Sequence, residues 1–177
     1  MAKNLPLKKS PVNCDVRPMK PTTFTLQLNN SGIAKTGDFP KLSKYGIYFI
    51  RSGKRVIRIG ECASGNSRLK KGFREPLRKV LRGKERTNYI AYSWRTKYKN
   101  SKLSVDYFSL DDEKLHEAKL RRALEAEVTF QFRISKKSWP IEMSEIHFLE
   151  KCRKNRLVVN TMKKLLEHYG CKYNAMV

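Results

Sequence analysis

Four side chains in the middle of the chain have the chemistry to act on a phosphate ester: Tyr48, Arg58, Arg68 and Glu125. A phenol, with a pKa of about 10, is a weak base until a neighbouring guanidinium stabilises the phenolate. A second guanidinium can hold two phosphate oxygens with its fork of donors, and a carboxylate can bind a hard divalent cation. Phosphodiester hydrolysis needs these three functions: an activated water, stabilised negative charge and help for the leaving oxygen.

A predicted β-hairpin would bring the tyrosine and the first arginine together. Residues 46–50 and 56–60 are two β-prone runs on either side of a turn at Gly53. We expect an odd-length loop centred on this glycine, which sets Tyr48 directly opposite Arg58 on one face of the sheet. A slip of one residue would separate the two side chains. The first run is continuously apolar, so both faces of the sheet should be covered there.

The other two candidate residues are expected on helices. Arg68 lies where a helix should begin after a small polar loop, and Pro76 should break or kink that helix. Glu125 lies in the longest predicted helix, which spans residues 112–132. The buried stripe of this helix has a spacing of four and is formed by Leu120, Leu124 and Val128.

The remaining patterns complete an α/β domain with a small antiparallel sheet flanked by helices. Further strands are expected at 23–28, 89–94 and 103–110, and further helices at 144–152 and 157–169, the last one capped by Gly170.

Composition divides the chain into three parts. Residues 1–40 form a basic, proline-rich N-terminal arm, residues 41–134 form the core with the candidate site, and residues 135–177 form a C-terminal helical extension.

The charge of the chain indicates an anionic partner. The 177 residues carry 39 Lys and Arg against 16 Asp and Glu, a net charge of +23. A nucleic acid is the natural candidate, because each neutralised phosphate releases a counterion. A membrane surface is less suited, because the basic residues are spread along the chain and form no single amphipathic helix. No run of apolar residues is long enough to cross a bilayer.

The cysteines and the N-terminus predict a cytoplasmic protein. The four cysteines form no Cys-x-x-Cys pair and have no histidine at zinc-ligand spacing, so we expect reduced thiols. The basic N-terminus lacks the apolar segment of a secretory signal.

The candidate residues and their order resemble the GIY-YIG nuclease family. Residues 45–50 read Tyr-Gly-Ile-Tyr-Phe-Ile, and residues 58–60 on the next strand read Arg-Ile-Gly. Arg68 falls where that family carries an arginine on its first helix, and Glu125 falls where it carries a metal-binding glutamate. The resemblance covers about residues 44–134.

Three positions differ from the family pattern. Arg58 replaces the tyrosine of the second motif, Gly72 stands where many members carry a histidine, and no clear match exists for an asparagine after the glutamate. Two glutamates compete for the metal. Glu125 fits the apolar spacing that follows the family's glutamate better than Glu127 does.

The resemblance implies a Mg²⁺-dependent endonuclease that cleaves double-stranded DNA, with Mn²⁺ as a substitute. In this interpretation Tyr48, Arg58, Arg68 and Glu125 are catalytic, and Glu125 holds the cation. The DNA-binding residues would be the basic side chains near them: Lys70, Lys71, Arg74, Arg95 and Lys97.

The absence of a recognisable separate DNA-binding module makes the chain most like the type II restriction endonucleases of that family, which often act as homodimers on palindromic sites. A low-specificity phage or mobile-element nuclease and a non-catalytic, basic nucleic-acid-binding protein are the alternatives.

Overall fold

The computed structural model describes residues 19–35, 38–74 and 94–173. The expected break at Pro76 and all but the last residue of the expected strand at 89–94 lie outside these ranges.

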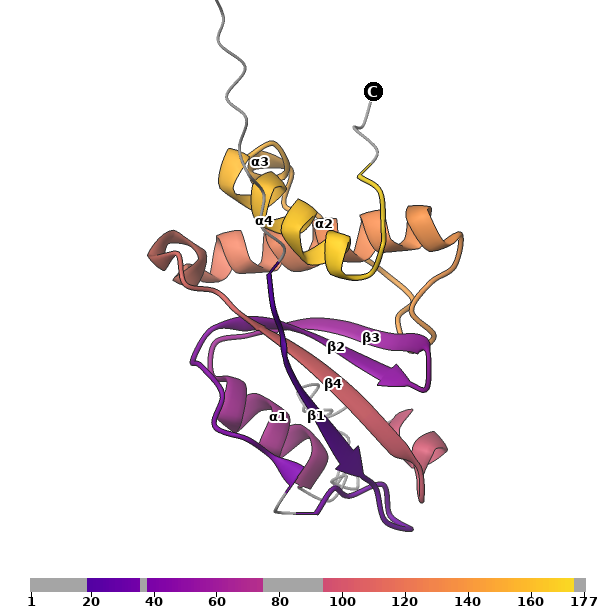
Figure 1. The fold of residues 1–177 in the computed structure, drawn as a ribbon. Coiled ribbons are helices and arrows are strands. Elements are labelled where there is room, and N and C mark those ends of the chain that lie inside the picture. Colours follow the sequence, from indigo (N-terminus) through magenta and orange to yellow (C-terminus); the bar gives the residue numbers. More distant parts are fainter. Residues whose placement is uncertain (1–18, 36–37, 75–93, 174–177) are drawn as a thin grey trace, which may run out of the picture.

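A four-stranded antiparallel sheet is the centre of the fold (Figure 1). Its strands are β1 (Thr22–Gln27), β2 (Gly46–Ser52), β3 (Arg55–Cys62) and β4 (Lys102–Ser109). Their order in the sheet is β1-β4-β2-β3, so the β2–β3 hairpin occupies one side and β3 is an edge strand. The structure confirms four expected strands, at 23–28, 46–50, 56–60 and 103–110. The first of them, β1, extends the sheet into the segment before residue 41.

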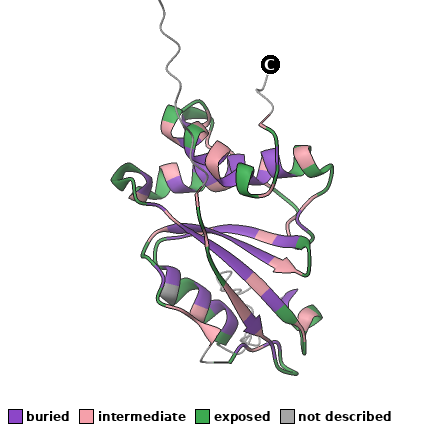
Figure 2. Ribbon diagram, viewed as in Figure 1, coloured by how far each residue is buried: buried purple, intermediate pink, exposed green. Residues whose placement is uncertain are grey.

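Helices cover both faces of the sheet (Figure 1). Helix α1 (Gly65–Arg74) lies on one face, and α2 (Ala118–Lys136) crosses the other face with α3 (Glu150–Arg153) and α4 (Arg156–His168) packed against it. This arrangement explains why the residues 46–50 of β2 are all buried (Figure 2). The prediction that both faces are covered is confirmed.

Two hydrophobic cores result, one on each side of the sheet. On the α1 side Tyr48 and Ile50 pack with Leu69 and Phe73 of the helix. On the α2 side the neighbouring residues of β2 pack with the apolar stripe of the long helix and with α4. The alternation along β2 therefore places Tyr48 on the α1 side of the sheet.

The predicted register of the hairpin is wrong. The turn has two residues, Gly53 with a φ of +57° and Lys54, and Ile57 is an extra residue in a β-bulge. A glycine at the first position suits such a two-residue turn, because its φ is positive. With the bulge, Gly60 lies opposite Tyr48, and Arg58 lies opposite Ile50.

Three helix predictions need correction. Helix α1 begins at Gly65 rather than near Arg68. The expected helix over residues 112–132 is a short 3-10 helix, η3 (Glu113–His116), followed by α2, with extended backbone at Glu117 between them. Residues 144–149, expected to be helical, are not, and only α3 forms there.

The expected C-terminal helix over 157–169 is confirmed as α4. Its side-chain cap is Asn155, which accepts hydrogen bonds from the next two backbone N–H groups of the helix. Gly170 follows the helix with a φ of +60°, as expected of a capping glycine.

A buried carboxylate ties four elements together. Asp106 of β4 is 1% exposed and accepts hydrogen bonds from Arg51 of β2, Thr23 of β1 and Tyr169 after α4. The ion pair to Arg51 has N···O distances of 2.7 and 3.0 Å. Burial alone would raise the pKa of Asp106, but these hydrogen bonds outweigh it, and the pKa lies below its ordinary value.

Asp106→Asn should therefore lower the free energy of unfolding at pH 7 by about 3 kcal/mol, because it leaves the half-buried Arg51 without its counter-charge. Since the native pKa is lowered, this stabilisation is present above pH 4 and is lost as the pH falls through the native pKa. Urea unfolding at pH 7 and pH 3 measures both effects. Asp111→Asn, at an exposed position, is the control, and an equal loss in both variants would contradict the prediction.

Candidate active site

The glycines of both motif segments make room for tyrosine rings. A Cβ placed on Gly60 would overlap the ring and hydroxyl of Tyr48, and a Cβ on Gly46 would overlap the ring of Tyr107 from β4. Tyr48 and Tyr107 are neighbours in the sheet, and each ring lies over a glycine of the next strand towards β3. The hydroxyl of Tyr48 is thereby held against the backbone of β3 at Gly60.

The loop after β3 and the start of α1 position Arg68. The N–H of Gly65 donates to the carbonyl of Lys44, and this glycine is also close to the Tyr107 hydroxyl, so the helix begins tight against the sheet. Arg68 lies in the first turn of α1 and is exposed. Its charge lowers the pKa of Glu125 on α2, across the sheet. Arg68 therefore lies at the same end of β3 as Glu125.

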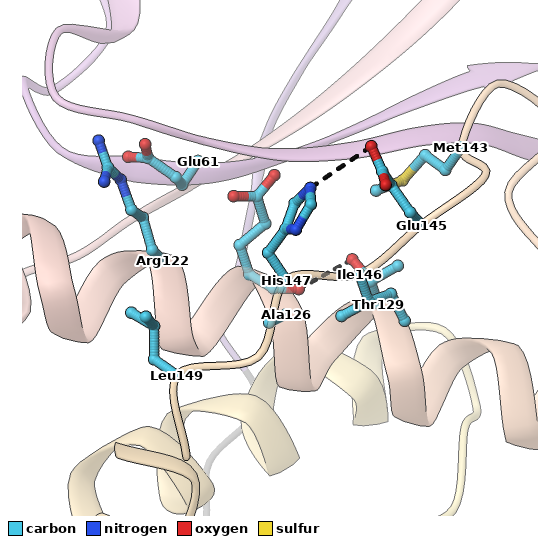
Figure 3. A pocket seen from close by; sticks show the side chains of 10 residues that line it. Glu61, Arg122, Ala126, Thr129, Met143, Glu145, Ile146, His147 and Leu149 are labelled. Carbon is cyan, nitrogen blue, oxygen red and sulfur yellow. Dashed lines mark hydrogen bonds and ion pairs between the residues drawn. The ribbon is translucent and has the colours of Figure 1, made fainter. Parts of the chain in front are cut away.

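Glu125 of α2 lines a cleft of about 410 Å³ between α2, β3 and the segment 141–149 (Figure 3). Glu61 of β3 lines the same cleft. The pKa of Glu125 is raised to about 7: burial raises it most and the nearby Glu61 carboxylate adds to this, whereas Arg58, Arg68 and a backbone hydrogen bond from Glu61 partly oppose the rise. A carboxyl that exchanges its proton near neutrality is typical of functional sites.

Arg58 lies beside the cleft rather than directly across from the tyrosine. Its Nη1 donates to the carbonyl oxygen of Glu142 at 3.3 Å, and its charge lowers the pKa of Glu125. The expected direct cross-strand pairing of Arg58 with Tyr48 is thus wrong, since Gly60 takes that place. Arg58 and Arg68 thus lie near enough to Glu125 for their charges to act on it, whereas Tyr48 meets β3 at Gly60 from the α1 side of the sheet.

The two glutamates that were candidates for the metal ligand have different surroundings. The carboxylate of Glu127 is buried and accepts a hydrogen bond from Arg153 at 2.6 Å, an ion pair that joins α2 to α3. Glu125 faces the cleft instead. The orientation of the two side chains favours Glu125 as the residue that meets a ligand.

The sequence interpretation missed three further charged residues of the site: Glu61, Arg121 and Arg122. Glu61 follows the second motif directly and forms an ion pair of 2.5 Å with the buried Arg121, which lies one turn before Glu125 on α2. Arg122 is exposed and lines the cleft. For Arg121 and Arg122 the available signal was their spacing of four and three residues from Glu125, because such residues share a helix face.

The five predicted DNA-binding residues have different surroundings. Lys71 and Arg74 are exposed on α1 and Lys70 is half-buried. Lys97 is exposed and pairs with the Glu142 carboxylate at 3.1 Å. Arg95 is 1% exposed and donates to the carbonyl of Gly72 in α1, and this burial argues against a contact between Arg95 and phosphate.

Comparisons with family models, with curated proteins and with solved structures found no match to this chain. None of the helices in the described ranges is long and apolar enough to span a membrane.

The donors in the cleft suit a hard cation, although few protein ligands are present. Within the described residues, no group of three or more Asp, Glu, His or Cys side chains is placed to hold a metal ion. Mg²⁺ is commonly held by one or two carboxylates, with substrate phosphate and water as its other ligands. Glu125, with Glu61 beside it, fits that mode of binding.

Without divalent metal, Glu125→Gln should stabilise the protein at pH 8. The raised pKa of Glu125 means that the folded state loses stability as the pH rises from about 4.5 to about 7, whereas a glutamine is neutral throughout. The gain of the variant over wild type should be near zero at pH 5 and about 1–3 kcal/mol at pH 8, measured by urea unfolding in EDTA. Glu127→Gln, which breaks an ion pair, should lose stability instead. Equal changes in both variants would refute the distinction.

Gly60→Ala should displace the Tyr48 ring and lower the free energy of unfolding by about 1–3 kcal/mol, because the added methyl overlaps that ring. Gly53→Asn in the hairpin turn is the control, since no atom lies within 4 Å of a Cβ there and asparagine tolerates positive φ. Thermal melting of the two variants measures the difference. A Gly60→Ala protein as stable as the control would show that the ring is not held by this contact.

Proposed function

We propose that this protein is a Mg²⁺-dependent endonuclease that hydrolyses phosphodiester bonds of double-stranded DNA, in the manner of the GIY-YIG family. The observation that carries the proposal is the half-buried carboxyl of Glu125, which faces the cleft, has the charges of Arg58 and Arg68 nearby and has a pKa of about 7. A structural glutamate on a helix surface would not combine burial, two nearby guanidinium groups and a cleft.

Each residue then has a defined task. Tyr48 accepts a proton from the attacking water, and its place over Gly60 holds its hydroxyl against β3. Arg68 binds the oxygens of the scissile phosphate, and Arg58 adds positive charge on the Glu125 side. Glu125 would hold the divalent cation, which when bound supplies Lewis-acid stabilisation of the leaving oxygen.

The exposed basic side chains on α1 extend the same surface. Lys71 and Arg74 follow Arg68 at helical spacing on the outer face of α1, where they would contact neighbouring phosphates. The net charge of +23 supports a polyanionic substrate. A site-specific restriction enzyme, acting as a homodimer, is the form of this activity that we favour over a low-specificity nuclease.

Incubation of plasmid DNA with the purified protein, with Mg²⁺ or with EDTA, tests the proposal. We expect discrete fragments with Mg²⁺ or Mn²⁺ and intact plasmid with EDTA. A smear would identify a low-specificity nuclease, and intact plasmid with every divalent metal would support a non-catalytic nucleic-acid-binding protein.

Two isosteric variants on the same helix separate chemistry from folding. Glu125→Gln should lower the cleavage rate by at least about 100-fold while DNA binding in a gel-shift assay persists, because the loss concerns the metal ligand. Glu127→Gln, assayed at a temperature at which circular dichroism shows it folded, should keep its cleavage rate within a few-fold of wild type. Full activity of Glu125→Gln would remove Glu125 from the mechanism.

A further inference from the structure

A histidine, His147, lines the cleft from the segment 141–149, which we call the strap. The strap has no regular secondary structure and lies beside β3, the last strand of the sheet. The N–H of Glu142 donates to the carbonyl of Ile57, and the N–H of Ile59 lies 3.3 Å from the Met143 sulfur. These contacts bring the following residues of the strap, Glu145 and His147, to the wall of the cleft.

The imidazole of His147 extends from the strap into the cleft, with Glu145 beside it (Figure 3). Its Nε2 lies 3.4 Å from the Glu145 carboxylate, which leaves Nδ1 for a second partner. The other charged groups that line this space are Glu61 from β3 and Arg122 and Glu125 from α2. The side chain of His147 is 83% exposed, so a substrate entering the cleft can reach it.

Tyr48 and His147 lie on different sides of β3. Tyr48 belongs to the hydrophobic core on the α1 side of the sheet, whereas His147 shares its cleft with α2 on the other side. Displacement at phosphorus requires the attacking and leaving oxygens to be in line on opposite sides of the phosphorus atom. A phosphate held at the edge of β3 near Gly60 would therefore have the attacking water toward Tyr48 and the leaving oxygen toward His147.

We propose that His147 is the general acid of the reaction, oriented by Glu145 as a positioning residue; this inference rests on the proposed nuclease function. The water oxygen forms a bond to phosphorus and gives its proton to the Tyr48 phenolate, while the bond from phosphorus to the leaving oxygen breaks. The imidazolium of His147 donates a proton to that leaving oxygen, so that the products are a phosphomonoester and an alcohol. The phenol and the neutral imidazole then exchange protons with solvent. Imidazole suits this task because it gains and loses protons near neutral pH.

Single-turnover cleavage of a duplex oligonucleotide that contains the mapped cleavage site tests this assignment. His147→Gln should cleave about 100-fold more slowly than wild type, because a general acid contributes about 10²–10⁴-fold. The same duplex with sulfur in place of the leaving oxygen needs no proton on its leaving group, so on it the variant should come within a few-fold of wild type. Added imidazole should restore part of the lost rate on the oxygen substrate.

His168→Gln on α4 is the matched control, since His168 is also exposed but lies away from the cleft. Glu145→Gln should lower the cleavage rate less than His147→Gln does. On the duplex with the sulfur leaving group its rate should likewise come within a few-fold of wild type. Equal slowing of His147→Gln on both substrates, or no slowing, would overturn the role of His147 while leaving the nuclease proposal intact. Failure of the wild-type protein to cleave either duplex would overturn both.

Discussion

The contact between the Tyr48 ring and Gly60 is the constraint on which the candidate site depends. It requires glycine at one position of β3, and it fits only the register that the two-residue turn and the bulge at Ile57 produce. A register without the bulge would place a different residue under the ring. The bulge thus sets both the place of the tyrosine hydroxyl and the direction of Arg58, in agreement with the frequent occurrence of bulges near active sites.

A second constraint is the uneven distribution of charge along α2. Within three residues this helix carries Glu127, whose charge is neutralised by Arg153, and Glu125, whose charge is opposed by burial and by Glu61. The first contributes to stability, and the second costs stability at neutral pH unless a cation or a proton is bound. Such a loss of stability at one residue is expected where selection acts on function as well as on folding.

Local patterns predicted much of the fold, and tertiary contacts decided the rest. The hairpin, β4 and α4 follow from apolar spacing and turn residues, and the four candidate catalytic residues were located from motif order alone. The bulge at Ile57 could not be predicted, because it depends on pairing across the sheet. The strap has apolar residues at helical spacing, but Glu142 is held by Arg58, Lys97, Tyr98 and the backbone of Ile57, and these distant contacts outweigh local propensity. The position of His147 at the cleft therefore could not be predicted from the sequence, because it depends on these distant contacts of the strap.

The strap has a consequence for self-assembly. An edge strand offers unpaired backbone groups to any other strand, and natural proteins protect such edges with loops or charged residues. Glu142 and Met143 of the strap are hydrogen-bonded to the backbone of β3 at Ile57 and Ile59. A second molecule therefore cannot continue the sheet on that side while the strap is in place. A homodimer of the kind proposed above would therefore have to associate through helices or through the opposite border of the sheet.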